Sequence, residues 1–179
     1  MANNDNAQAR RLLESMNAHN EQVLAEVFSK SYPLSKSANA QKKAEWAKHV
    51  CSFLEEHYED ETVKTISMDC ACGPSTRFAE KLKKVYDTEK DPAAFAEKIN
   101  QLELGFTLEY DWSNLYLIYP VCYCSCVNKN EETLSKTWCY CTLGYTKRMF
   151  KIIFEKEVQA ELISSIKMGD PECRIRIMA

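Results

Sequence analysis

The chain has 179 residues, of which 45% are hydrophobic and 27% charged, and its formal net charge is −3. This length suits one domain with a sizeable core, and the composition excludes a disordered chain. The charge offers no basic surface for nucleic acid. Neither a membrane-spanning apolar run nor the apolar stretch of a signal peptide is visible. We therefore expect a cytoplasmic protein that binds neither nucleic acid nor membrane.

Helical spacing of apolar residues dominates the first hundred residues. Tyr32-Pro33 is expected to break the pattern, because the residue before a proline avoids helical geometry. Asp91-Pro92 is typical of a helix start, and Gly105 of a helix end. The predicted helices cover residues 7 to about 28, 37 to 58, 75 to 86 and 92 to 105, and the segment 60–69 is short and either helical or irregular.

Aromatic and β-branched residues then predict strands, with one more helix between them. The predicted strands cover residues 106–110, 114–126, 157–166 and a final alternating run around Cys173, and the helix covers 142–154. The fold class is therefore α+β, with N-terminal helices followed by an antiparallel sheet with packed helices. We expect a single domain over 1–179, in which 1–58 is a helical extension and 60–179 a cysteine-rich core.

The chain contains nine cysteines, an odd number that excludes complete internal pairing. Thiols that cluster in a reducing compartment indicate metal ligands or redox chemistry before disulfides. Seven of them form three tight groups and are the candidate metal ligands: Cys70, Cys72, Cys122, Cys124, Cys126, Cys139 and Cys141. Thiolates favour soft ions, so zinc is the first expectation, with iron or an Fe–S centre as the alternative.

The expected positions of these groups suggest one shared site. The group 122–126 would place its three thiols on one face of a strand. The pairs at 70–72 and 139–141 would precede helices, where the dipole favours thiolates. The favoured ligands are Cys124, Cys126, Cys139 and Cys141, with Cys70 and Cys72 completing the set or lying just outside it. Cys51 and Cys173 lie on regular apolar stripes and are expected to be packing residues.

Other residue types give weaker signals. The histidines, His19, His49 and His57, all fall in N-terminal helices, and Asp69 is the one carboxylate adjacent to a cysteine group. No recognised catalytic motif is present. Aromatic residues that crowd the cysteine groups either line a small-molecule pocket or pack the sheet: Trp112, Tyr116, Tyr119, Tyr123, Trp138, Tyr140 and Tyr145.

The runs MDCACG, CYCSC and WCYCTLGY, followed by Gly169-Asp170 and Cys173, resemble a cysteine-rich bacterial subgroup of the 4-vinyl-reductase domain and L-2-amino-thiazoline-4-carboxylic acid hydrolase-like group. The resemblance covers residues 60–179. It implies an α+β fold with a small-ligand pocket between helices and sheet. It also implies sensing of redox state or metals, or a hydrolase activity that no catalytic constellation in the chain supports.

Three functions therefore remain open. The first is a small-ligand- or metal-binding sensing domain that uses a thiolate cluster. The second is a hydrolase-like enzyme with a cysteine nucleophile or a metal-activated water. The third is a thiol redox sensor that forms disulfides. A small-molecule ligand and a homodimer are compatible with each of them, and the catalytic residues of an enzyme would be unknown.

Overall fold

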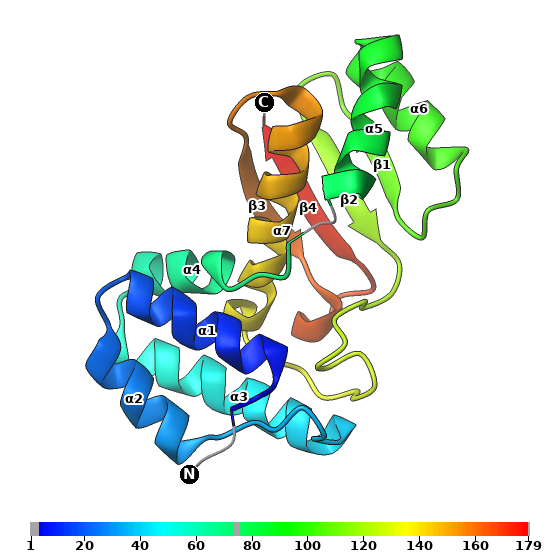
Figure 1. Ribbon diagram of the computed structural model, residues 1–179. Helices are drawn as coiled ribbons and strands as arrows, with labels where there is room; N and C mark the ends of the chain where they lie inside the picture. The colour runs from blue at the N-terminus through cyan, green and yellow to red at the C-terminus, as the bar shows by residue number, and fades with distance from the viewer. Residues whose placement is uncertain (1–3, 74–75, 179) are drawn as a thin grey trace. The chain divides into compact units, whose positions relative to one another are not determined.

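A computed structural model describes residues 4–73 and 76–178 (Figure 1). The chain forms two compact units, and each is built from discontinuous segments. Unit 1 comprises Met1–Cys72 and Cys124–Gly144, and unit 2 comprises Gly73–Tyr123 and Tyr145–Ala179. Along the described ranges, no helix combines the length and the apolar character that crossing a bilayer requires.

Unit 1 is helical. Its helices are α1 (Ala7–Ala18), α2 (Gln22–Ser31), α3 (Ala40–His57), α4 (Asp60–Asp69) and the start of α7 (Lys136–Phe154). The single helix expected over residues 7–28 is wrong, because the chain breaks after Ala18. Asn20 adopts a left-handed conformation with φ 65°, which asparagine tolerates better than most residues and which ends α1. Helix α1 then packs against both α2 and α4.

Helix α3 confirms the predicted second helix. Asn39 caps it by accepting a hydrogen bond from the Lys42 backbone N–H at 2.9 Å. Its buried side chains follow the predicted stripe and include Ala47 and Cys51, which is 4% exposed. Cys51 is thus a packing thiol, and burial raises its pKa to about 11.

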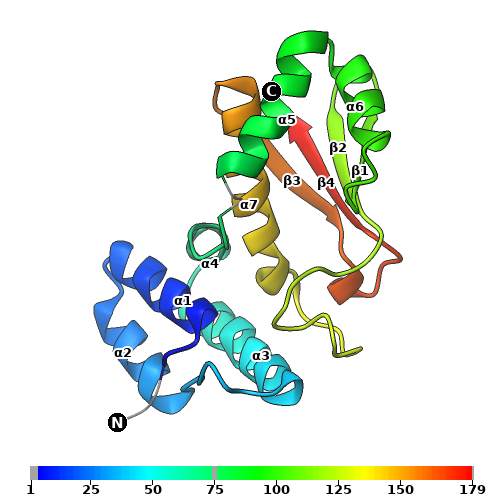
Figure 2. The ribbon, with the colours of Figure 1, turned by 45° about the vertical axis from the view of Figure 1, so that its right-hand side comes forward.

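Unit 2 contains the sheet. Its elements are α5 (Thr76–Glu89), α6 (Pro92–Asn100), β1 (Thr107–Tyr110), β2 (Leu115–Tyr119), the remainder of α7, β3 (Gln159–Ser164), the short 3₁₀ helix η1 (Ile166–Met168) and β4 (Cys173–Met178). The four strands are antiparallel in the order β1-β2-β4-β3. Helix α6 packs against β1 and α5 packs against α6 (Figure 2). These features confirm the α+β class.

The two faces of the sheet differ in chemistry because side chains alternate along each strand. One face is apolar, and Leu117 and Ile175, which are partners across β2 and β4, are both fully buried. The other face is charged. Arg174 pairs with Glu109 and lies over the Tyr116 ring, and Arg176 pairs with Glu161. The apolar face therefore packs in the core of unit 2, and the charged face lies on the opposite side of the sheet.

The start of α6 is as predicted, but its end is not. Asp91 accepts a hydrogen bond from the Ala94 backbone N–H at 2.8 Å, and Pro92 follows it. The helix ends at Asn100 rather than near Gly105. The Asn100 side chain then bonds to both the backbone N–H and the carbonyl of Leu108, each at 2.8 Å. These two hydrogen bonds hold the start of β1 against the end of α6.

Candidate functional site

The cysteine run 122–126 is not the strand that its composition predicts. Strand β2 ends at Tyr119, and Pro120, which has no backbone donor, follows it. Residues 124–128 instead form a turn, in which the Cys124 carbonyl accepts from the backbone N–H groups of Val127 and Asn128. The three thiols therefore do not share a strand face. Cys122 belongs to unit 2, whereas Cys124 and Cys126 belong to unit 1.

Helix α7 begins at Lys136, six residues earlier than predicted, so Cys139 and Cys141 lie within the helix. Its buried positions share a helical spacing of four and three residues, which the aromatic and cysteine-rich composition of this run obscures. These positions include Cys139, Leu143, Thr146, Phe150 and Ile153. The thiols at 139 and 141 are thus held by helix geometry and not by a loop.

The remaining pair also differs from expectation. Cys70 caps the C-terminal end of α4, where the helix dipole disfavours a thiolate, and does not lie at a helix start. Its sulfur donates to the Ser67 carbonyl at 3.2 Å, and its own carbonyl accepts from Arg11 on α1 at 3.2 Å. Cys72 is exposed.

Six of the seven candidate ligands nonetheless belong to unit 1. Burial raises the pKa of Cys141, and the charges of Cys124, Cys70, Cys139 and Cys72 raise it further. Cys126 joins this set through a hydrogen bond with Cys124. We call these residues the cysteine cluster: Cys70, Cys72, Cys124, Cys126, Cys139 and Cys141. No disulfide links any cysteines within the described part of the chain.

Cys124 and Cys126 have pKa values that are shifted in opposite directions, and we call them the polarised pair. The hydrogen bond from Cys126 is the main cause that lowers the pKa of Cys124 to about 6, and backbone N–H groups of the turn add to it. The same hydrogen bond and burial raise the pKa of Cys126. The buried indole N–H of Trp138 has no conventional hydrogen-bond partner, and it also favours the Cys124 thiolate. Cys124 is half-buried and Cys126 is 7% exposed.

A close backbone contact places α7 against α4. A Cβ atom added at Gly144 would lie 2.0 Å from the Met68 carbonyl oxygen. Only glycine permits this approach, which brings the helix that carries Cys139 and Cys141 to the helix that ends at Cys70. The local sequence does not predict this contact of Gly144, because its partner Met68 is distant along the chain.

Glu55 anchors the start of α7. Its carboxylate accepts hydrogen bonds from the hydroxyls of Ser135 and Thr137, the latter at 2.6 Å, and Thr137 is only 2% exposed. Nothing in the local pattern around Glu55 indicates a partner more than seventy residues away, so its role could not be predicted from the sequence.

Removing the Glu55 carboxylate should therefore destabilise unit 1. We expect Glu55→Ala to lower the free energy of unfolding by about 1–2 kcal/mol, because a buried hydroxyl loses its acceptor. Glu56→Ala, an exposed neighbour on the same helix, should change it by less than about 0.5 kcal/mol. Urea denaturation of both variants measures the difference, and equal effects would show that Glu55 does not anchor α7.

The arrangement of the described side chains bears on the predicted metal site. Among the residues described, no group of three or more His, Cys, Asp or Glu side chains is arranged to hold a metal ion. A small cavity of about 10 Å³, lined by Cys70, Cys141 and Trp138 among others, lies beside the thiols. This volume is roughly that of one water molecule. The assignment of the seven cysteines as ligands stays a prediction.

The predicted histidines and Asp69 contact residues outside the cysteine cluster. The Asp69 carboxylate lies 2.8 Å from His19 Nε2, within hydrogen-bond distance, at the α1–α4 contact. His57 stacks on Phe53. Of the aromatic residues proposed to line a pocket, Trp112 is 89% exposed at the β1–β2 turn, which is incompatible with that role.

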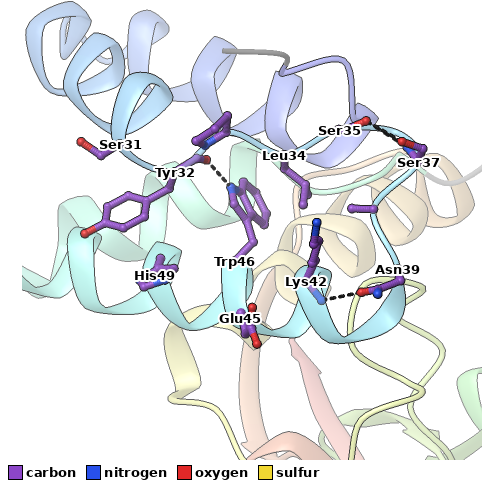
Figure 3. Close-up of a pocket in the computed structure, with 12 residues that line it drawn as sticks. Ser31, Tyr32, Leu34, Ser35, Ser37, Asn39, Lys42, Glu45, Trp46 and His49 are labelled. Carbon is purple, nitrogen blue, oxygen red and sulfur yellow. Dashed lines mark hydrogen bonds between the residues drawn. The ribbon is translucent and has the colours of Figure 1, made fainter.

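An open groove of about 520 Å³ lies instead between the end of α2 and the first turns of α3 (Figure 3). Tyr32 stacks on His49 with ring centroids 4.3 Å apart, and the Trp46 indole donates to the Tyr32 carbonyl at 3.0 Å. Serines line its rim, and Lys42 and Glu45 supply opposite charges. Local sequence patterns do not predict this groove, because its lining residues come from two helices and from the irregular loop between them.

The fold and the cysteine cluster define an α+β protein with a thiol-rich helical unit. A family model described as "Family of unknown function (DUF6144)" matches residues 1–179, and the chain belongs to this family. The resemblance to the 4-vinyl-reductase and hydrolase-like group is therefore wrong. The match includes the first two helices, which that resemblance left out.

No curated protein matches the chain. Among solved structures, an H-NOX protein from S. oneidensis in the Fe(II)NO ligation state is similar at 13% identity, with a TM-score of 0.44 and coverage of 96% of this chain and 97% of that one. The phenol-responsive sensory domain of the transcription activator PoxR is similar at 11% identity, with a TM-score of 0.37 and coverage of 76% and 73%.

Proposed function

We propose that the cysteine cluster of unit 1 is a thiol-based redox sensor, in which Cys124 and Cys126 are the reactive pair. The observation that carries this proposal is that Cys124 and Cys126 lie in one turn of unit 1, where the Cys126 thiol and backbone N–H groups lower the pKa of Cys124. Cys124 is the more accessible of the two, so an oxidant reaches it first. Cys126, two residues further along the same turn, is the thiol that we propose completes the disulfide.

The chemistry balances with a peroxide as the two-electron oxidant. The Cys124 thiolate attacks one peroxide oxygen, an S–O bond forms, and the O–O bond breaks with release of hydroxide, which is protonated to water. Cys126 loses its proton, and its sulfur attacks the sulfenic sulfur of Cys124. The S–S bond forms as the S–O bond breaks, and the leaving hydroxide becomes a second water.

The test is stoichiometric oxidation of the reduced full-length chain with hydrogen peroxide. Peptide mass spectrometry should show a Cys124–Cys126 disulfide before any other thiol is modified. Cys126→Ser should stop at the sulfenic acid of Cys124, which a dimedone probe traps. Cys173→Ser, which removes a half-buried thiol of unit 2, should oxidise as the wild type does. Preferential oxidation of any other pair would contradict the assignment.

Binding of a soft metal ion is the second candidate function. It is favoured by the chemistry of the cysteine cluster, since thiolates select zinc, copper(I) or iron. Zinc remains the first expectation, with iron as the alternative. Protein prepared anaerobically should then carry about one equivalent of metal, and a paired Cys139→Ser and Cys141→Ser change should remove it. Less than about a tenth of an equivalent in the wild type would exclude this candidate.

A further inference from the structure

The groove between the end of α2 and the first turns of α3 is a candidate small-molecule site. Its described lining residues all belong to unit 1 and include no member of the cysteine cluster. Its floor is apolar, since Leu34 and Trp46 are only 2% and 4% exposed. The stacked rings of Tyr32 and His49 form one wall (Figure 3). The volume of about 520 Å³ lies within the range of sites that hold small ligands.

The loop that forms the other wall is anchored to the N-terminal segment. The Leu34 backbone N–H donates to the Asn4 side chain at 2.9 Å, and the Leu34 carbonyl accepts from the Asn6 N–H at 3.2 Å. Two residues further along, the Lys36 backbone N–H donates to the Asp5 carboxylate at 2.7 Å. Walls that are fixed before a ligand arrives lose little conformational entropy on binding. The groove is therefore preorganised.

Two opposite charges lie close together at this groove. Lys42 and Glu45 are both exposed and both line it, and residues three apart on a helix are neighbours on its surface. The Lys42 side chain extends from α3 toward the loop that carries Leu34 (Figure 3). Neither charge takes part in an ion pair within residues 4–73 and 76–178, and the Glu45 carboxylate accepts a hydrogen bond from Gln41 at 3.1 Å. Both charges are therefore available to a ligand.

We propose that this groove binds a small zwitterion that carries an aromatic ring, of the class of the aromatic amino acids. The Lys42 ammonium group binds the ligand carboxylate, and the Glu45 carboxylate binds the ligand ammonium group. The ligand ring packs against the Tyr32–His49 pair above the apolar floor, as aromatic rings do in offset or edge-to-face contacts. Exposed ion pairs contribute little individually, so affinity requires the ring and both charges together. This inference is independent of the proposed redox function.

The experiment is an NMR titration of the isotope-labelled full-length chain with phenylalanine. Backbone signals of residues 31–49 and the Trp46 indole signal should shift and saturate, with a dissociation constant below about 1 mM. Phenylpropionate lacks the ammonium group and phenethylamine lacks the carboxylate, so each should bind about threefold to fivefold more weakly. Signals that do not saturate with phenylalanine up to about 10 mM would overturn the proposal.

Two charge variants assign the ligand groups. Lys42→Ala should weaken phenylalanine and phenylpropionate by the same three- to fivefold factor and leave phenethylamine unchanged, whereas Glu45→Gln should weaken phenylalanine and phenethylamine and leave phenylpropionate unchanged. The matched controls are Lys36→Ala, in the same loop but outside the lining, and Glu56→Gln, near the other end of α3. Both should bind all three probes as the wild type does, and their spectra, like those of the charge variants, report folding directly.

Three outcomes would contradict the assignment. Phenylpropionate or phenethylamine that binds as tightly as phenylalanine would show that the ligand is not read as a zwitterion. Equal binding of acetylphenylalanine amide, which carries neither charge, would show that the groove takes a peptide segment instead. Saturating shifts that lie outside residues 31–49 would place the binding site elsewhere in the chain.

Discussion

Gly144→Ala should lower the free energy of unfolding by about 3 kcal/mol or more. The new methyl carbon would lie 2.0 Å from the Met68 carbonyl oxygen, and both atoms belong to helical backbone that cannot rotate away. Helices α4 and α7 must then separate, which costs more than ordinary overpacking by a flexible side chain. Urea denaturation followed by circular dichroism measures the loss.

Gly73→Ala is the matched control for this prediction. A Cβ atom at Gly73 would have no neighbour within 4 Å, so the same chemical change meets no obstacle there. We expect a change of less than about 0.5 kcal/mol. If both alanine variants were equally stable, the close approach of α4 and α7 would not exist in the protein.

Cys124 should be alkylated by iodoacetamide with a rate that is half-maximal near pH 6. The thiolate is the nucleophile, so the rate should reach its plateau above about pH 7 and fall as protons return below the pKa of about 6. A thiol with the ordinary pKa of 9.0 would be about 1% ionised at pH 7, whereas Cys124 would be about 90% ionised. Mass spectrometry of the peptide that contains Cys124 gives the rate at each pH.

Cys126→Ala removes the largest cause of this low pKa. The half-maximal pH should move upward, and the rate at pH 7 should fall by about tenfold or more. Cys51→Ala, which deletes a buried thiol outside the cysteine cluster, should leave the profile in place. A wild-type profile with its midpoint near pH 9 would contradict the polarised pair.

Much of the fold can be predicted from local patterns. The α3 stripe, the cap at Asp91 and the alternation in β4 each depend on neighbours in sequence, and the structure agrees with each. The α1–α2 break was missed because the apolar spacing continues through it, while a single left-handed residue, Asn20, redirects the chain. Patterns of burial do not report backbone conformation at one position.

The candidate site was harder to predict because its segments are distant in sequence. Grouping of the thiols in the sequence predicts a shared site, and this stays a prediction. The aromatic neighbours of Cys122 and Cys124 suggested a strand, yet Pro120 ends β2 before the cysteines begin. Contacts such as Glu55 with Thr137 link residues far apart along the chain, and no local propensity encodes them.

The side-chain amide of Asn100 has a consequence for how this protein meets other chains. Strand β1 is an edge of the sheet, and an unpaired edge is a template on which another strand can add. The Asn100 amide occupies the N–H and the carbonyl of Leu108 as a neighbouring strand would. The middle of the β1 edge is thereby closed to strand addition, which disfavours edge-to-edge association of unit 2 through β1.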